Sequence, residues 1–444
     1  MSTSFIQLLI FLLAGIALII LLTAKFRVHA FFALLLACFV VGFGVQLSAS
    51  NILATIGEGF GHIMQSLGLI IVLGTTLGVL LEHSGCTRVM ADFVMNKTGK
   101  TRAAFAMSVS GFIVGLPVFC DSGYIVLSGL NQSLAKRTGI SIVIMAVSLA
   151  TGLYSVHCLI PPHPGATAAA STIGVDFGKL IAIGIATALP GMWVGHWWAT
   201  YMGKRLAHVE ADKEHIVHHG HAPNVLLAFL PVIIPILLIT TNSFFRVETN
   251  GDNVLQKIFA VFGEPPVALL IGIVLVLVSV RRWTRQDVSK ILQEGAEKAG
   301  AILVIIGAGG AFGAVLTAAK IGDHFSHFAN LQSMGIFFPF LLTSLLKTAQ
   351  GSSTVAIITA SSIVLPLLSP LGLDTENGRL LCVLSMGAGS MMISHANDAY
   401  FWVISKFSGL EMKTMLKVYS VATVLMGCVT LLVVYILSLI LLSK

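Results

Sequence analysis

Five ionisable side chains stand within strongly apolar parts of the sequence: Asp121, His163, Lys347, His395 and Asp398. A charge in an apolar environment is costly, so such residues normally have a partner or a function. Histidine titrates near neutral pH, and a carboxyl group in a partly dry cavity can also exchange protons there. These residue types therefore suit the uptake and release of protons, and a lysine suits the binding of an anionic solute.

Each of these residues also has a structural alternative. The two aspartates would satisfy backbone N–H groups, and the two histidines would act as hydrogen-bonded struts between neighbouring helix segments. Lys347 would either offset a substrate carboxylate or pair with a nearby aspartate. The sequence leaves both roles open for all five residues.

The chain as a whole has the composition of a helical membrane protein. Of its 444 residues 56% are hydrophobic and only 10% are charged, whereas soluble domains carry about 25% charged residues. Apolar runs such as 5–24, 224–245 and 415–442 exceed the roughly 18 residues that indicate a membrane-spanning helix. This composition excludes a secreted protein, a cytosolic enzyme and a disordered scaffold. The net charge of +7 is then a matter of membrane orientation rather than of nucleic-acid binding.

The sequence lacks the motifs of metal sites and of catalysis. Its six cysteines are scattered without a C-x-x-C pair, and neither H-E-x-x-H nor G-x-S-x-G occurs. We therefore expect no metal, no cofactor and no enzymatic activity.

Four apolar segments are interrupted at their centres by Pro, Gly, Ser, Asn or His, and they hold all five ionisable residues. Irregular backbone at membrane depth is tolerated only where protein or a water-filled cavity satisfies its polar groups. The segments are 103–134, interrupted at Gly115-Leu-Pro-Val-Phe-Cys-Asp-Ser-Gly123, 140–174 at Pro161-Pro-His-Pro-Gly165, 334–368 at Lys347-Thr-Ala-Gln-Gly-Ser-Ser-Thr354, and 379–408 at Ser394-His-Ala-Asn-Asp-Ala-Tyr400.

The predicted elements occur in the same order in both halves of the chain. Each half has two helices, an amphipathic stretch that runs into a helix, two interrupted segments and a last helix. We expect one repeat over 1–202 and a second over 224–444, joined by a charged, His-rich cytoplasmic linker at 203–223. The fold class is an all-α polytopic membrane protein with two inverted-topology repeats, about 10 full crossings, two re-entrant helical hairpins and two broken helices.

The distribution of Lys and Arg gives an orientation. If 103–134 and 334–368 are the hairpins and 140–174 and 379–408 the broken helices, each half crosses an odd number of times and the second half is inverted. With both termini outside, most Lys and Arg residues fall in the inside connections, as the positive-inside rule requires. The two hairpin tips then converge near the midplane.

Inverted repeats with broken helices that meet at mid-membrane are typical of secondary transporters. A helix N-terminus freed at a break favours an anion, and free carbonyls can bind a cation. We expect the four breaks to form the substrate site jointly. Its candidate residues are Asp121, Ser122, Gly123, His163, Gly165, Thr167, Gln350, Gly351, Ser352, Ser353, Thr354 and Asn397, with Asp121, His163, His395 and Asp398 as candidates for proton coupling.

The interrupted motifs resemble those of the gluconate permease (gluconate:proton symporter) family, within the ion-transporter superfamily. The resemblance rests on Gly115–Gly123, Pro161–Gly165, Gln350-Gly-Ser-Ser-Thr-Val-Ala356 and Ser394-His-Ala-Asn-Asp398 with Phe401-Trp402, and it extends over essentially the whole chain. Within these motifs, Cys120 stands where the family usually has an aromatic residue, and Lys347 replaces the commoner Arg. The resemblance implies proton-coupled uptake of gluconate or related acids, some members carrying D-serine, and a homodimer in the bacterial inner membrane.

The sequence thus predicts a symporter that imports a small hydroxy-carboxylate with protons. A carrier of the same fold driven by Na⁺ is the nearest alternative, since Asp, Asn, Ser and free carbonyls also suit Na⁺. An anion channel and an intramembrane hydrolase are further alternatives. The sequence also predicts that Asp398→Asn abolishes concentrative uptake and leaves expression intact.

Overall fold

The computed structural model describes residues 5–98, 102–206, 224–248, 261–280, 283–319, 329–395 and 398–442. Over these residues the protein is built from helices without strands, which confirms the predicted helical membrane fold. Six of the described helical segments are long and apolar enough to cross a bilayer. Most of the predicted linker, residues 207–223, lies outside the described residues, and so does the candidate site residue Asn397.

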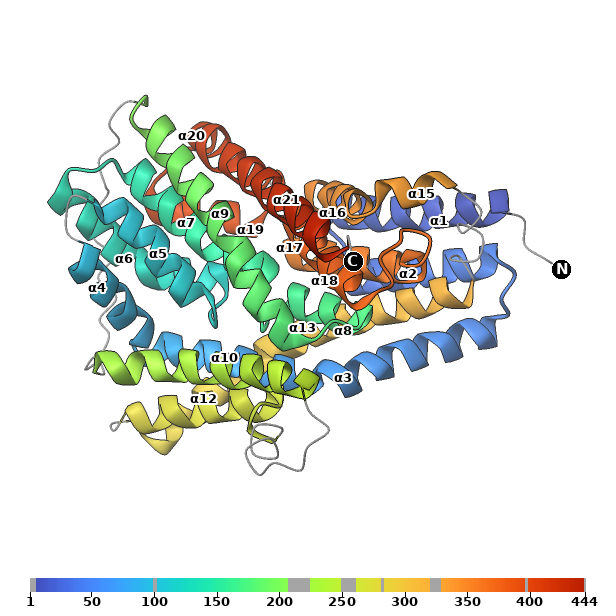
Figure 1. Cartoon of the computed structure of the whole chain (residues 1–444), viewed down its shortest axis with the longest axis horizontal. Coiled ribbons are helices and arrows are strands. Elements are labelled where there is room, and N and C mark those ends of the chain that lie inside the picture. Colours follow the sequence, from blue (N-terminus) through green and yellow to red (C-terminus); the bar gives the residue numbers. More distant parts are fainter. Residues whose placement is uncertain are drawn as a thin grey trace.

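The first half of the chain contributes a long helix, two interrupted pairs and a long closing helix (Figure 1). Its elements are α1 (Phe5–Ile20), continued by one π-helical turn, then α2 (Ala30–Gly44), α3 (Ala49–His83), α4 (Cys86–Thr98), α5 (Ala103–Gly115), α6 (Cys120–Thr138), α7 (Ile142–Leu159), α8 (Pro164–Ile173) and α9 (Phe177–Gly203).

The second half follows the same order. Its elements are α10 (Val225–Glu248), α12 (Pro265–Ser279), α13 (Arg285–Ala318), the short α15 (Ala329–Met334), α16 (Phe337–Gln350), α17 (Ser353–Val364), α18 (Glu376–Met391), α19 (Ala399–Ser408), and α20 (Met412–Met415), which runs through one π-helical turn into α21 (Val421–Leu441).

Each predicted interruption falls between two helices. The gaps lie between α5 and α6, α7 and α8, α16 and α17, and α18 and α19. Pro162 and Pro164 cannot both continue a helix from α7, because proline lacks the N–H donor. At the third break Gly351 closes α16 with a φ of 77°, a left-handed conformation that glycine adopts without strain.

The long helices α3 and α13 pack against each other over much of their length. Each is one continuous helix, in which the predicted amphipathic stretch runs directly into the predicted apolar helix. Ser48 caps α3 by accepting from the Asn51 N–H at 3.2 Å, and Thr284 and Asp287 form a capping box at the start of α13. With capped ends and no proline inside, nothing in either sequence ends the helix early.

Glycines allow this close approach. A Cβ on Gly59 of α3 would lie 2.6 Å from the Gly310 carbonyl oxygen of α13, and a Cβ on Gly295 of α13 would lie 2.7 Å from the Thr76 hydroxyl. Small residues at helix interfaces are the usual device for tight packing in membranes.

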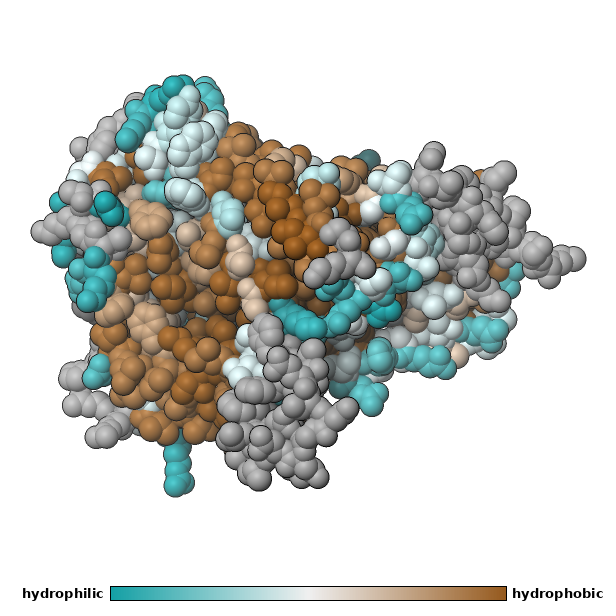
Figure 2. All heavy atoms as spheres, viewed as in Figure 1, coloured by the Kyte–Doolittle hydropathy of each residue, from teal (hydrophilic) through white to brown (hydrophobic). Residues whose placement is uncertain are grey.

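The outer surface separates apolar from polar residues along the long axis of the view. Figure 2 shows hydrophilic residues gathered toward the two ends, with a broad apolar surface between them over α10, α12 and α21. Single helices there expose large side chains such as Leu237, Val278 and Leu439. This is the surface that lipid covers in a membrane protein.

The contact between α5 and α7 gives a test of the fold. A Cβ on Gly152 would lie 2.1 Å from the Ser108 carbonyl oxygen and 3.0 Å from the Phe112 nitrogen, both backbone atoms that cannot rotate away. We expect Gly152→Ala to destabilise the protein by about 1–3 kcal/mol, measured as a lower melting temperature of the detergent-purified protein. Gly57→Ala in α3 is the control, since its Cβ meets nothing within 4 Å. Equal melting temperatures for the two variants would contradict the packing.

Candidate functional site

The four breaks surround one cavity of about 440 Å³. Every break contributes to its lining, and α7 and α13 supply the remaining walls. The lining residues are Phe119, Cys120, Asp121, Ser122, Tyr154, His157, Pro164, Lys298, Ala301, Ile302, Ile305, Gly351, Ser352, Ser353, Thr354, Val355, Asp398, Ala399 and Tyr400. The structure therefore brings the four predicted breaks together.

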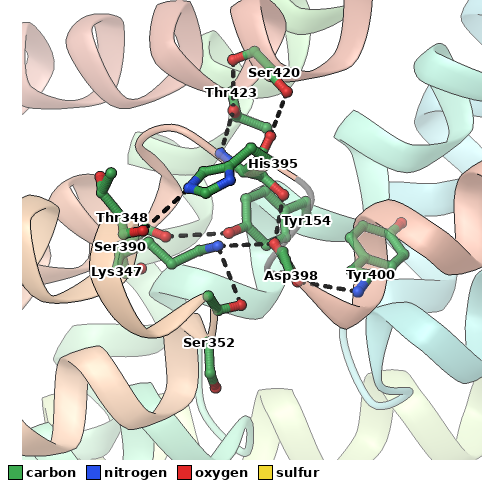
Figure 3. Close-up of polar contacts among 12 residues, drawn as sticks. Tyr154, Lys347, Thr348, Ser352, Ser390, His395, Asp398, Tyr400, Ser420 and Thr423 are labelled. Carbon is green, nitrogen blue, oxygen red and sulfur yellow. Dashed lines mark hydrogen bonds and ion pairs between the residues drawn. The ribbon is translucent and has the colours of Figure 1, made fainter. Parts of the chain in front are cut away.

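A buried ion pair joins the third and fourth breaks. Lys347 Nζ lies 2.8 Å from Asp398 Oδ2, and the two side chains are 0% and 8% exposed (Figure 3). Lys347 also lies 3.4 Å from the Gly351 carbonyl, and Ser394 donates its hydroxyl to Asp398. Of the two roles open to Lys347, the geometry favours pairing with an aspartate.

Asp398 has a second role at the start of α19. Its Oδ1 accepts from the Tyr400 N–H at 3.0 Å, so the carboxylate caps the helix as well as neutralising Lys347. Asp398 also lines the cavity. A single residue thus links the ion pair, the helix start and the site.

The two histidines make matching contacts across their breaks. His163 Nε2 lies 2.6 Å from the Gly115 carbonyl, the last residue of α5, and His395 Nε2 lies 3.1 Å from the Thr348 carbonyl near the end of α16. A carbonyl oxygen only accepts, so Nε2 carries the hydrogen in both. This is the geometry of the strut, and neither histidine lines the cavity.

The first break places Asp121 and Ser122 on the cavity wall, at the start of α6. Asp121 is half-buried and has no ion-pair partner within the described part of the chain; Cys120 Sγ lies 4.0 Å from its Oδ1. Of the four candidates for proton coupling, Asp121 is therefore the one that faces the cavity without a fixed partner.

The other predicted site residues divide into lining and packing positions. Gly351, Ser352, Ser353 and Thr354 line the cavity. Gly123 instead packs on Leu153, and Gly165 packs against Thr354 and Ile357 of α17. Thr167 and Gln350 lie behind the wall, with side-chain polar atoms that are buried and unpartnered among the described residues.

The sequence-based site omits two cavity residues with chemistry of their own. His157 of α7 lies with its ring centroid 4.8 Å from that of His163, and its Nδ1 is buried without a hydrogen-bond partner in the described structure. As a histidine inside an apolar segment, it carried the same signal as His163. Lys298 gave no such signal, because it lies on the amphipathic, charged half of α13.

The sequence of the whole chain agrees with a known family. The sequence pattern that defines the GntP family permease matches residues 6–440 of this chain. The chain belongs to the GntP permease family. It is a multi-pass membrane transporter, not an enzyme, as its sequence predicts.

Related proteins resemble this GntP permease along nearly their full length. It is 32% identical to the gluconate permease of Pseudomonas aeruginosa over 437 residues, which cover 96% of each chain. It is 29% identical to the Gnt-II system L-idonate transporter of Escherichia coli over 434 residues, covering 96% of this chain and 97% of that one. Its fold is similar to that of the YdaH transporter of Alcanivorax borkumensis, with a TM-score of 0.66 at 15% identity over 88% and 89% of the two chains.

The ion pair of this permease can be tested by removing one or both charges. Removing one partner of a buried pair leaves an uncompensated charge at a cost of about 3–5 kcal/mol. We therefore expect Lys347→Met or Asp398→Asn alone to lower the melting temperature and folded yield strongly, unlike the unchanged expression that the sequence alone predicts. Asparagine still caps α19, so the loss reports the charge.

The double variant and a surface control complete this test. Lys347→Met combined with Asp398→Asn removes both charges, and its stability should recover most of the loss. Lys406→Met, an exposed lysine of α19, should change little. Additive losses in the double variant would show that the two charges do not depend on each other.

Proposed function

We propose that this GntP permease imports a small hydroxy-carboxylate, gluconate or a related sugar acid, by proton symport. The observation that carries the proposal is the convergence of four helix N-termini on one cavity. The first residues of α6, α8, α17 and α19, which are Cys120, Pro164, Ser353 and Ala399, all line it. Helix N-termini carry partial positive charge and free N–H groups, so their convergence favours an anion.

One of these N-termini presents uncapped N–H groups on the cavity wall. Ser352 and Asp398 cap α17 and α19, and α8 begins at Pro164, which has no N–H. The N-cap residue of α6 makes no side-chain cap, and Cys120, Asp121 and Ser122 line the cavity. The free N–H groups of α6 suit a carboxylate, and Ser122, Ser353 and Thr354 suit the hydroxyl groups of a sugar acid. The gluconate and L-idonate transporters among the relatives support this class of substrate.

Asp121 is the favoured proton-coupling residue within this proposal. It lines the cavity without an ion-pair partner in the described structure, whereas Asp398, His163 and His395 are engaged with Lys347 or with carbonyls. Na⁺ coupling is the alternative, because the Asp121 carboxylate, the Ser122 hydroxyl and break carbonyls also provide oxygen ligands.

We also propose that 1–202 and 224–444 are inverted repeats, with the linker at 203–223 and most Lys and Arg inside, both termini outside, and a homodimer in the bacterial inner membrane. Helix contacts that correspond to each other in the two halves support the repeats. The contact of α1 with α2 corresponds to that of α10 with α12, and the contact of α2 with α13 corresponds to that of α12 with α3. In the same way α5 with α7 corresponds to α16 with α18, and α6 with α19 corresponds to α17 with α8. Gly59 and Gly295 occupy equivalent places in the pair of long helices.

Uptake by the purified protein tests the coupling. We expect proteoliposomes to accumulate labelled gluconate or a related hydroxy acid under an imposed pH gradient in Na⁺-free buffer, and to lose accumulation when an uncoupler is added. Accumulation that requires Na⁺ at constant pH would establish the alternative. Non-saturating flux without accumulation would indicate a channel, and a chemically altered solute would indicate a hydrolase.

The role of Asp121 has its own signature. Asp121→Asn removes the titratable proton and keeps the side-chain volume, so pH-driven accumulation should fall at least about tenfold, while exchange of labelled for unlabelled substrate continues. Asp374→Asn, on an exposed connection before α18, is the matched control. Undiminished accumulation by Asp121→Asn would remove this residue from the coupling step.

A further inference from the structure

We infer that Lys298 is the cation that binds the substrate carboxylate, and that Glu294 makes this binding depend on the protonation of His83. The inference rests on the function proposed above and assigns residues that the sequence-based site does not include. It identifies one wall of the cavity, on α13, as the place where a carboxylate is recognised.

Lys298 is the one permanently cationic side chain on the described cavity wall. It lies on α13 one turn before Ala301 and Ile302, which line the same cavity. The other lysine of the region, Lys347, is buried against Asp398 and is already neutralised. A carboxylate that enters the cavity therefore meets its counter-charge at Lys298, in the same cavity as the uncapped N-terminus of α6.

Lys298 is held by a carboxylate that it shares with a histidine. Lys298 Nζ lies 2.7 Å from Glu294 Oε1, and His83 Nε2 lies 2.9 Å from Glu294 Oε2. The side chains are 38%, 38% and 43% exposed, respectively. Ion pairs this exposed contribute little, so a substrate carboxylate can replace Glu294 at Lys298. The fully buried Lys347–Asp398 pair offers no such exchange.

The shared Glu294 carboxylate couples the protonation of His83 to the binding of substrate at Lys298. Because His83 and Lys298 hold different oxygens of Glu294, they interact through charge: the positive charge of protonated His83 offsets the charge of Glu294, which weakens its hold on Lys298 and makes Lys298 more available to the substrate. By reciprocity, substrate bound at Lys298 releases Glu294 to His83⁺ and favours the proton there. Substrate affinity should therefore be higher when His83 is protonated than when it is neutral.

One further carboxylate belongs to this cluster. Glu82, next to His83, interacts electrostatically with Lys298, His83 and Glu294, and also interacts with Ser122 of α6. On α4, Arg88 and Asp92 pair with each other at 3.9 Å, and α6 contributes Asp121 to the lining of the same cavity. The described parts of α2, α8 and α12, which also pack against α3, carry no charged side chain.

Counterflow in proteoliposomes, with equal pH on both sides, tests the inference for the hydroxy acid that the wild type carries. Lys298→Gln should raise KM at least about tenfold, the loss expected for a charge-assisted contact, with a smaller change in the maximal rate. Lys298→Arg should stay near wild type, and Lys290→Gln, on the exposed start of α13, is the control.

The pH dependence separates coupling from mere structural support. The wild-type KM should rise with pH as His83 loses its proton. Glu294→Gln should hold KM at its low, acid value, because it removes the carboxylate that holds Lys298. His83→Gln should hold KM at its high, alkaline value, because it removes the cation that weakens this hold. Wild-type KM in Lys298→Gln, or parallel shifts in Glu294→Gln and His83→Gln, would overturn the inference while the transport function stands. Absence of counterflow for every hydroxy acid by folded wild type would overturn the proposed function and the inference with it.

Discussion

The buried ion pair between Lys347 and Asp398 is the constraint on which the site depends. Both charges lie in the protein interior, and each is tolerable only while the other stays in contact. Because Lys347 belongs to the last turn of α16 and Asp398 caps α19, the ion pair holds the end of α16 against the start of α19. The third and fourth breaks, and the part of the cavity wall that they form, are thereby fixed to each other.

The histidine contacts complete the electrostatic arrangement around the cavity. At a broken helix, free carbonyls at one end oppose the free N–H groups at the other. His163 and His395 donate to carbonyls at or near the ends of α5 and α16, away from the cavity lining. The starts of α6, α8, α17 and α19 remain on the lining. The cavity lining therefore combines four helix N-termini and Lys298 with two carboxylates, Asp121 and Asp398, and Lys347 neutralises the second of these.

The sequence predicts the local features of this arrangement and misses those that depend on tertiary contacts. Clusters of proline, glycine and polar residues inside apolar segments are sufficient to locate all four breaks, because such clusters indicate irregular backbone that protein or a cavity must satisfy at membrane depth. The partner of Lys347 is 51 residues away, so the sequence could not decide between a substrate and Asp398. Lys298 and Glu294 looked like the polar face of an amphipathic helix. Only the packing of α13 against α3 brings them to His83 and to the cavity.

The two long helices also determine how one wall of the cavity is held. One wall belongs to α13, which is packed tightly on α3 through Gly59, Gly295 and Gly310, and the other walls belong to the breaks. Between these bodies, α13 meets α17 through Gly309 and Gly313, opposite Ile358 and Ser362, with one hydrogen bond of 2.7 Å from the Ser362 hydroxyl to the Gly309 carbonyl. The Ile358 side chain occupies the space that a side chain on Gly309 would need, so α17 approaches α13 as closely as α3 does. The glycines of α13 thus place Lys298 on a wall that is packed on one side against α3 and on the other against the third break.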